Sequence, residues 1–127
     1  MKRSYRKKIY EDNPTANETT KRVIEYLLAN GYHAWRNNTY GIYDEKAKKY
    51  LPLQYQQRGV ADILGFSLQE GRFLAIEIKA GEDILSNEQI EFLGVVHSSK
   101  GIAMMVHSFD DFLKKWERRF LNAKAEP

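Results

Sequence analysis

The stretch that most constrains the fold is Phe73-Leu74-Ala75-Ile76-Glu77-Ile78-Lys79, an apolar run that ends in two charged residues. Successive side chains of a strand point to opposite faces, so apolar residues at every position from 73 to 76 predict a strand covered on both faces. Such a strand lies in the centre of a sheet. The chain is therefore expected to form a layered α/β fold around it.

Local patterns predict the element order helix, strand, hairpin, strand, strand, helix, strand, helix. Caps of the Ser/Thr-x-x-Glu/Gln type are expected at Thr15 with Glu18 and at Ser86 with Gln89, and Ser108 is expected to cap the last helix. The expected ranges are 15–29, 32–36, 40–43 with 49–53, 60–66, 72–79, 87–99, 102–106 and a helix from 109.

The sheet type, the residues that end helices and strands, and the apolar faces of the helices can also be predicted. The helix between the last two strands is a crossover, so the sheet is partly parallel and mixed, with helices on its faces. Asn30-Gly31, Glu70-Gly71 and Gly101 are expected to end elements, and Pro52 predicts an edge or irregular arm. The apolar helix faces are Val23, Ile24, Leu27 and Leu28 in the first helix, and Phe109, Phe112, Leu113, Trp116 and Phe120 in the last.

Composition limits the classes of protein. A chain of 127 residues fits one domain, expected over residues 14–127, with residues 1–13 as a flexible basic arm. The absence of cysteine excludes disulfides and thiolate zinc sites. No apolar run approaches the ~20 residues of a membrane span, and no signal peptide is evident, so a cytoplasmic location is expected.

Basic residues are concentrated at the N-terminus. Residues 1–10 hold five of the 20 basic residues and no acidic one, which leaves 15 basic against 17 acidic residues in the rest of the chain. A basic arm can follow a phosphate backbone because released counterions favour such contacts. It can equally be a solvated terminus that aids solubility.

Three charged side chains lie in the two strands predicted over 60–66 and 72–79, which are otherwise largely apolar. Glu77 and Lys79 share a face of their strand, about 7 Å apart, and Asp62 can lie across from them on the preceding strand. Buried carboxylates need positive charge nearby, and carboxylate oxygens with the Ile78 carbonyl suit Mg²⁺ or Mn²⁺. The simpler alternative is a cross-strand salt bridge near the surface, worth under about 1 kcal/mol.

A metal centre of this kind predicts phosphodiester hydrolysis. The metal would polarise a phosphate oxygen and a water, while the Lys79 ammonium orients that water or neutralises charge on the phosphate. A covalent nucleophile is not needed, and none is evident: the sequence has no cysteine and no G-x-S-x-G elbow.

Four longer motifs of the sequence resemble those of a known protein family. They are Gly59-Val60-Ala61-Asp62-Ile63-Leu64-Gly65, Gly71 to Lys79, Leu85-Ser86-Asn87-Glu88-Gln89 and Gly101-Ile102-Ala103. Asp62 followed by Glu77-Ile78-Lys79 resembles the signature of the PD-(D/E)xK nuclease superfamily, and the whole set resembles the stand-alone VRR-NUC nuclease domains of phages and bacteria. The resemblance covers roughly residues 17–111. It implies a restriction-endonuclease-like αβ core, Mg²⁺ or Mn²⁺ as cofactor, and DNA as substrate, in a bacterial or phage-infected cell.

The resemblance also implies roles for individual residues. Asp62, Glu77 and Lys79 carry over as catalytic residues, and Glu18 would complete the metal ligands with Asp62, Glu77 and Ile78. Gln89 would contact the water or the scissile phosphate. Arg36, Asn38 and Arg58 would contact DNA phosphates. Simpler roles are helix capping for Glu18 and Gln89 and solvation for the arginines. The histidines His33, His97 and His107 show no ligand spacing and are interpreted as structural.

The function predicted from these features is a metal-dependent DNA endonuclease, structure-selective for branched DNA or Holliday junctions. A non-catalytic nucleic-acid-binding module with the same fold is the main alternative. An interaction protein whose carboxylates form salt bridges is a third. A small nuclease of this type is expected to act as a homodimer, with the 40–53 hairpin and the Tyr32–Tyr43 stretch as candidate interfaces.

Overall fold

The predicted order of helices and strands is confirmed. The computed structural model of the protein describes residues 14–37, 42–51 and 57–125. The basic arm at residues 1–13, Asn38 and Pro52 lie outside the described residues. The elements are α2 (Pro14–Ala29), β1 (Tyr32–Arg36), β2 (Ile42–Asp44), β3 (Lys49–Leu51), β4 (Ile63–Ser67), β5 (Phe73–Ile78), α3 (Asn87–Ser98), β6 (Ile102–Val106) and α4 (Phe109–Ala125).

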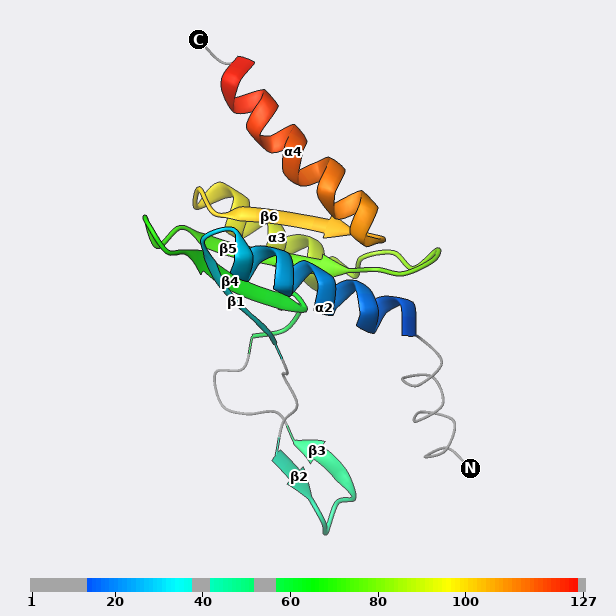
Figure 1. Cartoon of the computed structure of the whole chain (residues 1–127). Helices are drawn as coiled ribbons and strands as arrows, with labels where there is room; N and C mark the ends of the chain where they lie inside the picture. Colours follow the sequence, from blue (N-terminus) through cyan, green and yellow to red (C-terminus); the bar gives the residue numbers. More distant parts are fainter. Residues whose placement is uncertain (1–13, 38–41, 52–56, 126–127) are drawn as a thin grey trace.

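The main sheet is mixed and has four strands in the order β1-β4-β5-β6 (Figure 1). The pairs β1–β4 and β4–β5 are antiparallel, whereas β5 and β6 run parallel, joined by the crossover helix α3. The strands β2 and β3 form a separate antiparallel hairpin. As expected from its apolar run, β5 is an inner strand, and its residues from Leu74 to Ile78 are buried.

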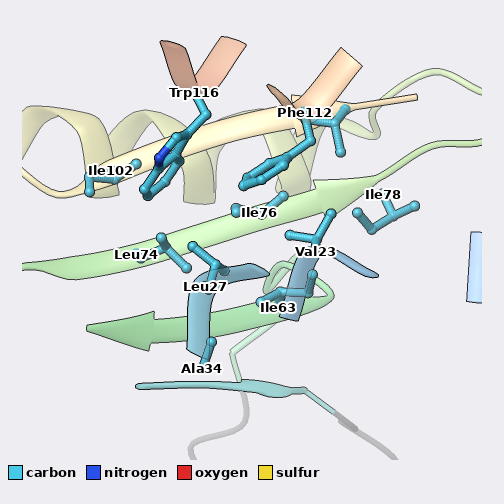
Figure 2. Packing of buried hydrophobic residues seen from close by; sticks show 11 residues of the cluster. Val23, Leu27, Ala34, Ile63, Leu74, Ile76, Ile78, Ile102, Phe112 and Trp116 are labelled. Carbon is cyan, nitrogen blue, oxygen red and sulfur yellow. The ribbon is translucent and has the colours of Figure 1, made fainter. Parts of the chain in front are cut away.

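Helices cover both faces of this sheet. On one face, α2 and α4 pack against the sheet through a continuous apolar cluster, in which Phe112 and Trp116 lie over Leu74 and Ile76 (Figure 2). On the other face, α3 packs against β5 and β6 through Leu93 and Val96. Within the described residues, no helix is both long and apolar enough to cross a lipid bilayer.

The start and the apolar face of α2 differ from the prediction. The helix begins at Pro14, so Thr15 lies inside the helix and is not its N-cap. Proline suits the first helical position because the backbone N–H that it lacks would have no helical partner there. Leu28 is 52% exposed, so the buried stripe is narrower than predicted, although Val23 and Leu27 are fully buried.

The strands that hold the charged residues are shorter than predicted. The strand expected over 60–66 begins at Ile63, and the one expected over 72–79 spans Phe73–Ile78. One reason is that the Asp62 carboxylate accepts a hydrogen bond from the Ile78 N–H, at 2.8 Å. The Asp62 side chain thus accepts a hydrogen bond that a backbone carbonyl would accept in a regular sheet, so the backbone pairing of β4 with β5 stops there.

The ends of the two C-terminal helices are largely as predicted. Ser86 caps α3 and Ser108 caps α4, because each side-chain oxygen accepts a backbone N–H three residues on. After α3, however, the left-handed residue is Lys100, with φ 69°, and not Gly101. Glycine is needed at 101 for close approach, since a Cβ there would lie 2.7 Å from Val96 Cγ1. Phe120, expected in the apolar stripe of α4, is 47% exposed.

Candidate functional site

The antiparallel pairing of β4 and β5 brings the two predicted acids together. Ile63 pairs with Ile76, so the preceding Asp62 faces Glu77 across the hairpin. The hydrogen bond from the Ile78 N–H to Asp62 Oδ2 fixes the Asp62 carboxylate beside the end of β5. The prediction that Asp62 lies across from the Glu77–Lys79 segment is therefore confirmed.

Glu77 is a buried acid whose hydrogen bonding is incomplete. The residue is 3% exposed, and its Oε2 atom has no hydrogen-bond partner among the described residues. Burial raises the pKa of the Glu77 carboxyl to about 8. A hydrogen bond that the protonated carboxyl can make with Asp62, and the charge of Asp62, add to this rise of the pKa, while Lys79 opposes it. The protein thus holds an acceptor oxygen that a proton or a cation would satisfy.

Within the described residues, neither carboxylate of this pair is neutralised by an ion pair. Among residues 14–37, 42–51 and 57–125, ion pairs join Lys21 to Glu25 and Lys115 to Asp111, and neither Asp62 nor Glu77 takes part in one. The described residues also contain no group of three or more acidic, histidine or cysteine side chains arranged around a metal position. Glu18 is exposed on α2, and within the described residues it forms no such group with Asp62 and Glu77.

Gln89 connects the first turn of α3 to the acidic pair. Its Oε1 accepts from the Ser86 N–H at 2.8 Å, which completes the predicted capping box, and its Nε2 donates to Glu77 Oε1 at 3.2 Å. Capping and a role at the site were alternatives in the sequence. In the structure, one side-chain amide caps the helix and also contacts the Glu77 carboxylate. The predicted contact with water or the scissile phosphate stays a prediction.

Gly59 allows α3 to approach this region closely. It adopts φ 73°, and a Cβ at this position would lie 2.4 Å from the Glu88 carbonyl carbon and oxygen and 2.7 Å from the Gln89 nitrogen. These are backbone atoms at the start of α3, so they cannot move away without shifting the helix. Gly59 therefore sets the position from which Gln89 reaches Glu77.

A Gly59→Ala variant is expected to lose more stability than a Gly71→Ala variant. Both glycines have positive φ, 73° and 69°, but a Cβ at Gly71 would meet nothing within 4 Å. Gly71→Ala therefore reports the backbone cost alone, about 1–2 kcal/mol. Gly59→Ala adds a backbone clash and should lose about 2 kcal/mol more in urea unfolding. Equal losses would contradict the close approach.

The backbone of Lys79 is anchored by Val106 and by His107, which was interpreted from the sequence as structural. Its N–H donates to Val106 O at 2.9 Å. His107 Nδ1 lies 2.7 Å from Lys79 O. A carbonyl can only accept, so His107 Nδ1 carries the proton. The His107 N–H in turn donates to Asp111 Oδ2 at 2.9 Å. Sequence spacing could not reveal this contact, which joins residues 28 positions apart.

The predicted phosphate-binding residues are dispersed. Arg36 Nη1 donates to Asn17 Oδ1 at 3.1 Å, which directs Arg36 towards α2 and away from the sheet face that carries Glu77. Arg58 is exposed, and it immediately precedes Gly59, which lies against the start of α3. Asn38 lies outside the described residues.

Comparisons with models of known protein families, with curated proteins and with solved structures gave no match.

Proposed function

We propose that the protein is a metal-dependent deoxyribonuclease that hydrolyses phosphodiester bonds at the Asp62–Glu77–Lys79 centre. The observation that carries the proposal is the Glu77 carboxylate. It is buried beside a second acid, its Oε2 has no hydrogen-bond partner among the described residues, and no ion pair neutralises it there. Keeping such a pair in a folded protein is costly unless a proton or a cation satisfies that oxygen, and the proposal is that a cation does so in the working protein.

The donor atoms suit a hard divalent cation. Asp62 and Glu77 offer carboxylate oxygens on adjacent strands, and the Ile78 carbonyl is the third candidate ligand. Mg²⁺ commonly binds through one or two carboxylates and retains several waters, so this small set fits. When bound, such an ion supplies Lewis-acid chemistry, which neutralises phosphate charge and favours attack by water. Glu18 remains a proposed additional ligand by resemblance.

The protein's own groups then have distinct tasks. The Ile78 N–H fixes the Asp62 carboxylate, and the Gln89 amide fixes that of Glu77. Lys79, whose backbone is anchored to Val106 and His107, brings an ammonium group to orient water or to offset charge that develops on the phosphate. Arg58 is a proposed phosphate contact near the start of α3, and Arg36 and Asn38 are proposed contacts by resemblance.

The resemblance to VRR-NUC domains supports a more specific proposal. The mixed sheet with its parallel β5–β6 pair, and the acids at the β4–β5 hairpin, agree with the restriction-endonuclease-like core that the resemblance implies. Family membership is inferred from the motifs alone, as is action on branched DNA or four-way junctions by a homodimer.

A cleavage panel tests the proposal. Duplex, single-stranded, flap and four-way DNA are incubated with the protein and Mn²⁺ or Mg²⁺, with and without chelator, and with Asp62→Asn as the variant. We expect chelator-sensitive cutting that Asp62→Asn abolishes. DNA binding without metal-dependent cutting of any substrate would instead identify a non-catalytic binding module.

A further inference from the structure

An aromatic surface lies on the same sheet face as the acidic pair. The rings of His33, Trp35 and Phe66 contact one another, with centroids 5.2 Å apart for His33–Phe66, 5.5 Å for His33–Trp35 and 6.3 Å for Trp35–Phe66. Trp35 is 39% exposed and Phe66 is 37% exposed. The alternate residues Ala34 and Ile63 are buried under α2 on the opposite face. This aromatic surface therefore faces outward on the side of α3.

The aromatic surface is exposed because α3 covers only half of its face. The helix packs on β5 and β6, behind which it lies in Figure 1. Leu64 of β4 still packs against the cluster under α3. Within the described residues, the rings of Trp35 and Phe66 lie beyond this cover and stay in contact with solvent. A cluster of exposed aromatic rings on a sheet is a recognised sign of a binding surface.

The strand register connects this surface to the acidic pair. Phe66 pairs with both His33 and Phe73, and Trp35 pairs with Leu64. Asp62 is two residues from Leu64 and four from Phe66, so the aromatic side chains lie about 7 and 14 Å from the acids along the strands. In B-form DNA the nucleotides of one strand rise about 3.4 Å each. A DNA strand whose phosphate lies at the proposed metal centre would therefore reach these rings within a few nucleotides.

Cations lie at the far end of the aromatic surface. Phe73, which is 41% exposed, also lines an open pocket of about 1000 Å³ at the ends of β5 and α3. Arg72, Lys100 and His97 line this pocket as well, with Glu70 as its single acid. Arg72 Nε donates to Lys100 O at 2.8 Å, which fixes the guanidinium and leaves its other N–H groups to contact a ligand. The pocket thus offers positive charge beside an aromatic ring.

We propose that the surface formed by His33, Trp35, Phe66 and Phe73 stacks unpaired bases of a DNA strand, while Arg72 and Lys100 contact its phosphates. Aromatic rings interleaved with cations match a single strand, which presents π-faces and an anionic backbone together. The paired bases of an intact duplex offer no such faces. A second copy of the chain would match the rings but would bring the same cations. The inference rests on the proposed nuclease function and specifies its substrate as DNA with an unpaired segment next to the cut.

Binding to a short oligo(dT) in the presence of chelator tests the inference without cleavage. The chain has two tryptophans, and Trp116 is 3% exposed, so Trp35 dominates the quenching of fluorescence by acrylamide. We expect the oligonucleotide to protect Trp35 from acrylamide. Trp35→Leu and Phe66→Leu should each weaken binding, measured by fluorescence anisotropy of labelled oligo(dT), by about tenfold. Leu28→Ala, an exposed apolar residue on α2, is the matched control and should bind normally.

The outcomes separate this inference from the nuclease proposal. Folded Trp35→Leu and Phe66→Leu variants that bind oligo(dT) like the wild type would overturn the stacking role, even if Mn²⁺-dependent cutting of DNA persists. Sedimentation in which these variants change only the oligomeric state would also overturn it, in favour of a second copy as the occupant. Stacking without any metal-dependent cutting would support the aromatic surface and refute the nuclease.

Discussion

Replacing Lys79 with alanine is expected to lower the DNA cleavage rate by at least about 100-fold, with little change in the affinity for DNA. The ammonium group is proposed to act on charge that develops during the reaction, so its loss should affect kcat more than KM. The fold should survive because Lys79 is held through its backbone, by Val106 and His107. Single-turnover cleavage at saturating Mn²⁺ measures the effect.

Two variants sharpen this test. Lys79→Arg keeps the positive charge with a different shape and should recover part of the lost rate. Lys114→Ala removes an exposed lysine of α4 and should cut like the wild type. Should Lys79→Ala cut at the wild-type rate, Lys79 has no part in the reaction, and the assignment of this centre as the nuclease site fails.

Replacing Glu77 with glutamine is expected to stabilise the metal-free protein above pH 8. In the folded protein, burial and the adjacent Asp62 raise the pKa of Glu77 to about 8, from an ordinary value of 4.5. Below pH 4.5 the carboxyl is protonated in both the folded and the unfolded states, so it costs nothing. Between pH 4.5 and 8 the unfolded chain releases the proton and the folded protein retains it, so stability falls as pH rises. Above pH 8 the penalty is complete.

Glutamine does not titrate, so this loss should be absent from Glu77→Gln. Thermal unfolding in chelator from pH 4 to 9 should show a declining midpoint for the wild type and a flatter profile for the variant. The difference above pH 8 corresponds to a few kcal/mol, or on the order of 10 °C. Added Mn²⁺ should stabilise the wild type and not Glu77→Gln. Glu91→Gln, at an exposed position of α3, is the control. Parallel profiles for wild type and Glu77→Gln would contradict the burial cost.

Local signals predicted most of the fold. The Ser86–Gln89 capping box, the Ser108 cap and the apolar run of β5 each depend on residues close together in sequence, and each was identified correctly. Errors arose where tertiary contacts decide. Periodicity could not show that Leu28 lies at the exposed edge of its stripe. It also could not foresee that the Asp62 side chain would replace a ladder carbonyl and delay the start of β4.

One part of the geometry of the candidate site was also predicted from the sequence. A hairpin with Asp62 on one strand and Glu77 on the other brings the two acids together through local pairing, which sequence can anticipate. The anchoring of Lys79 by His107 depends on a strand and a loop far apart in the chain, so spacing carries no trace of it. Glu18 was assigned to the site from a motif match, and such a match could not reveal that its side chain is exposed on α2.

The two hydrogen bonds of the Gln89 side-chain amide link the formation of the first turn of α3 to the orientation of the Glu77 carboxylate. Its Oε1 is engaged at the start of α3, and its Nε2 is engaged at Glu77 on β5. Fraying of the first helical turn therefore releases the Glu77 carboxylate as well. We therefore expect the helix start and Glu77 to open together, so that the hydrogen bond that orients Glu77 persists only while α3 stays docked on the sheet.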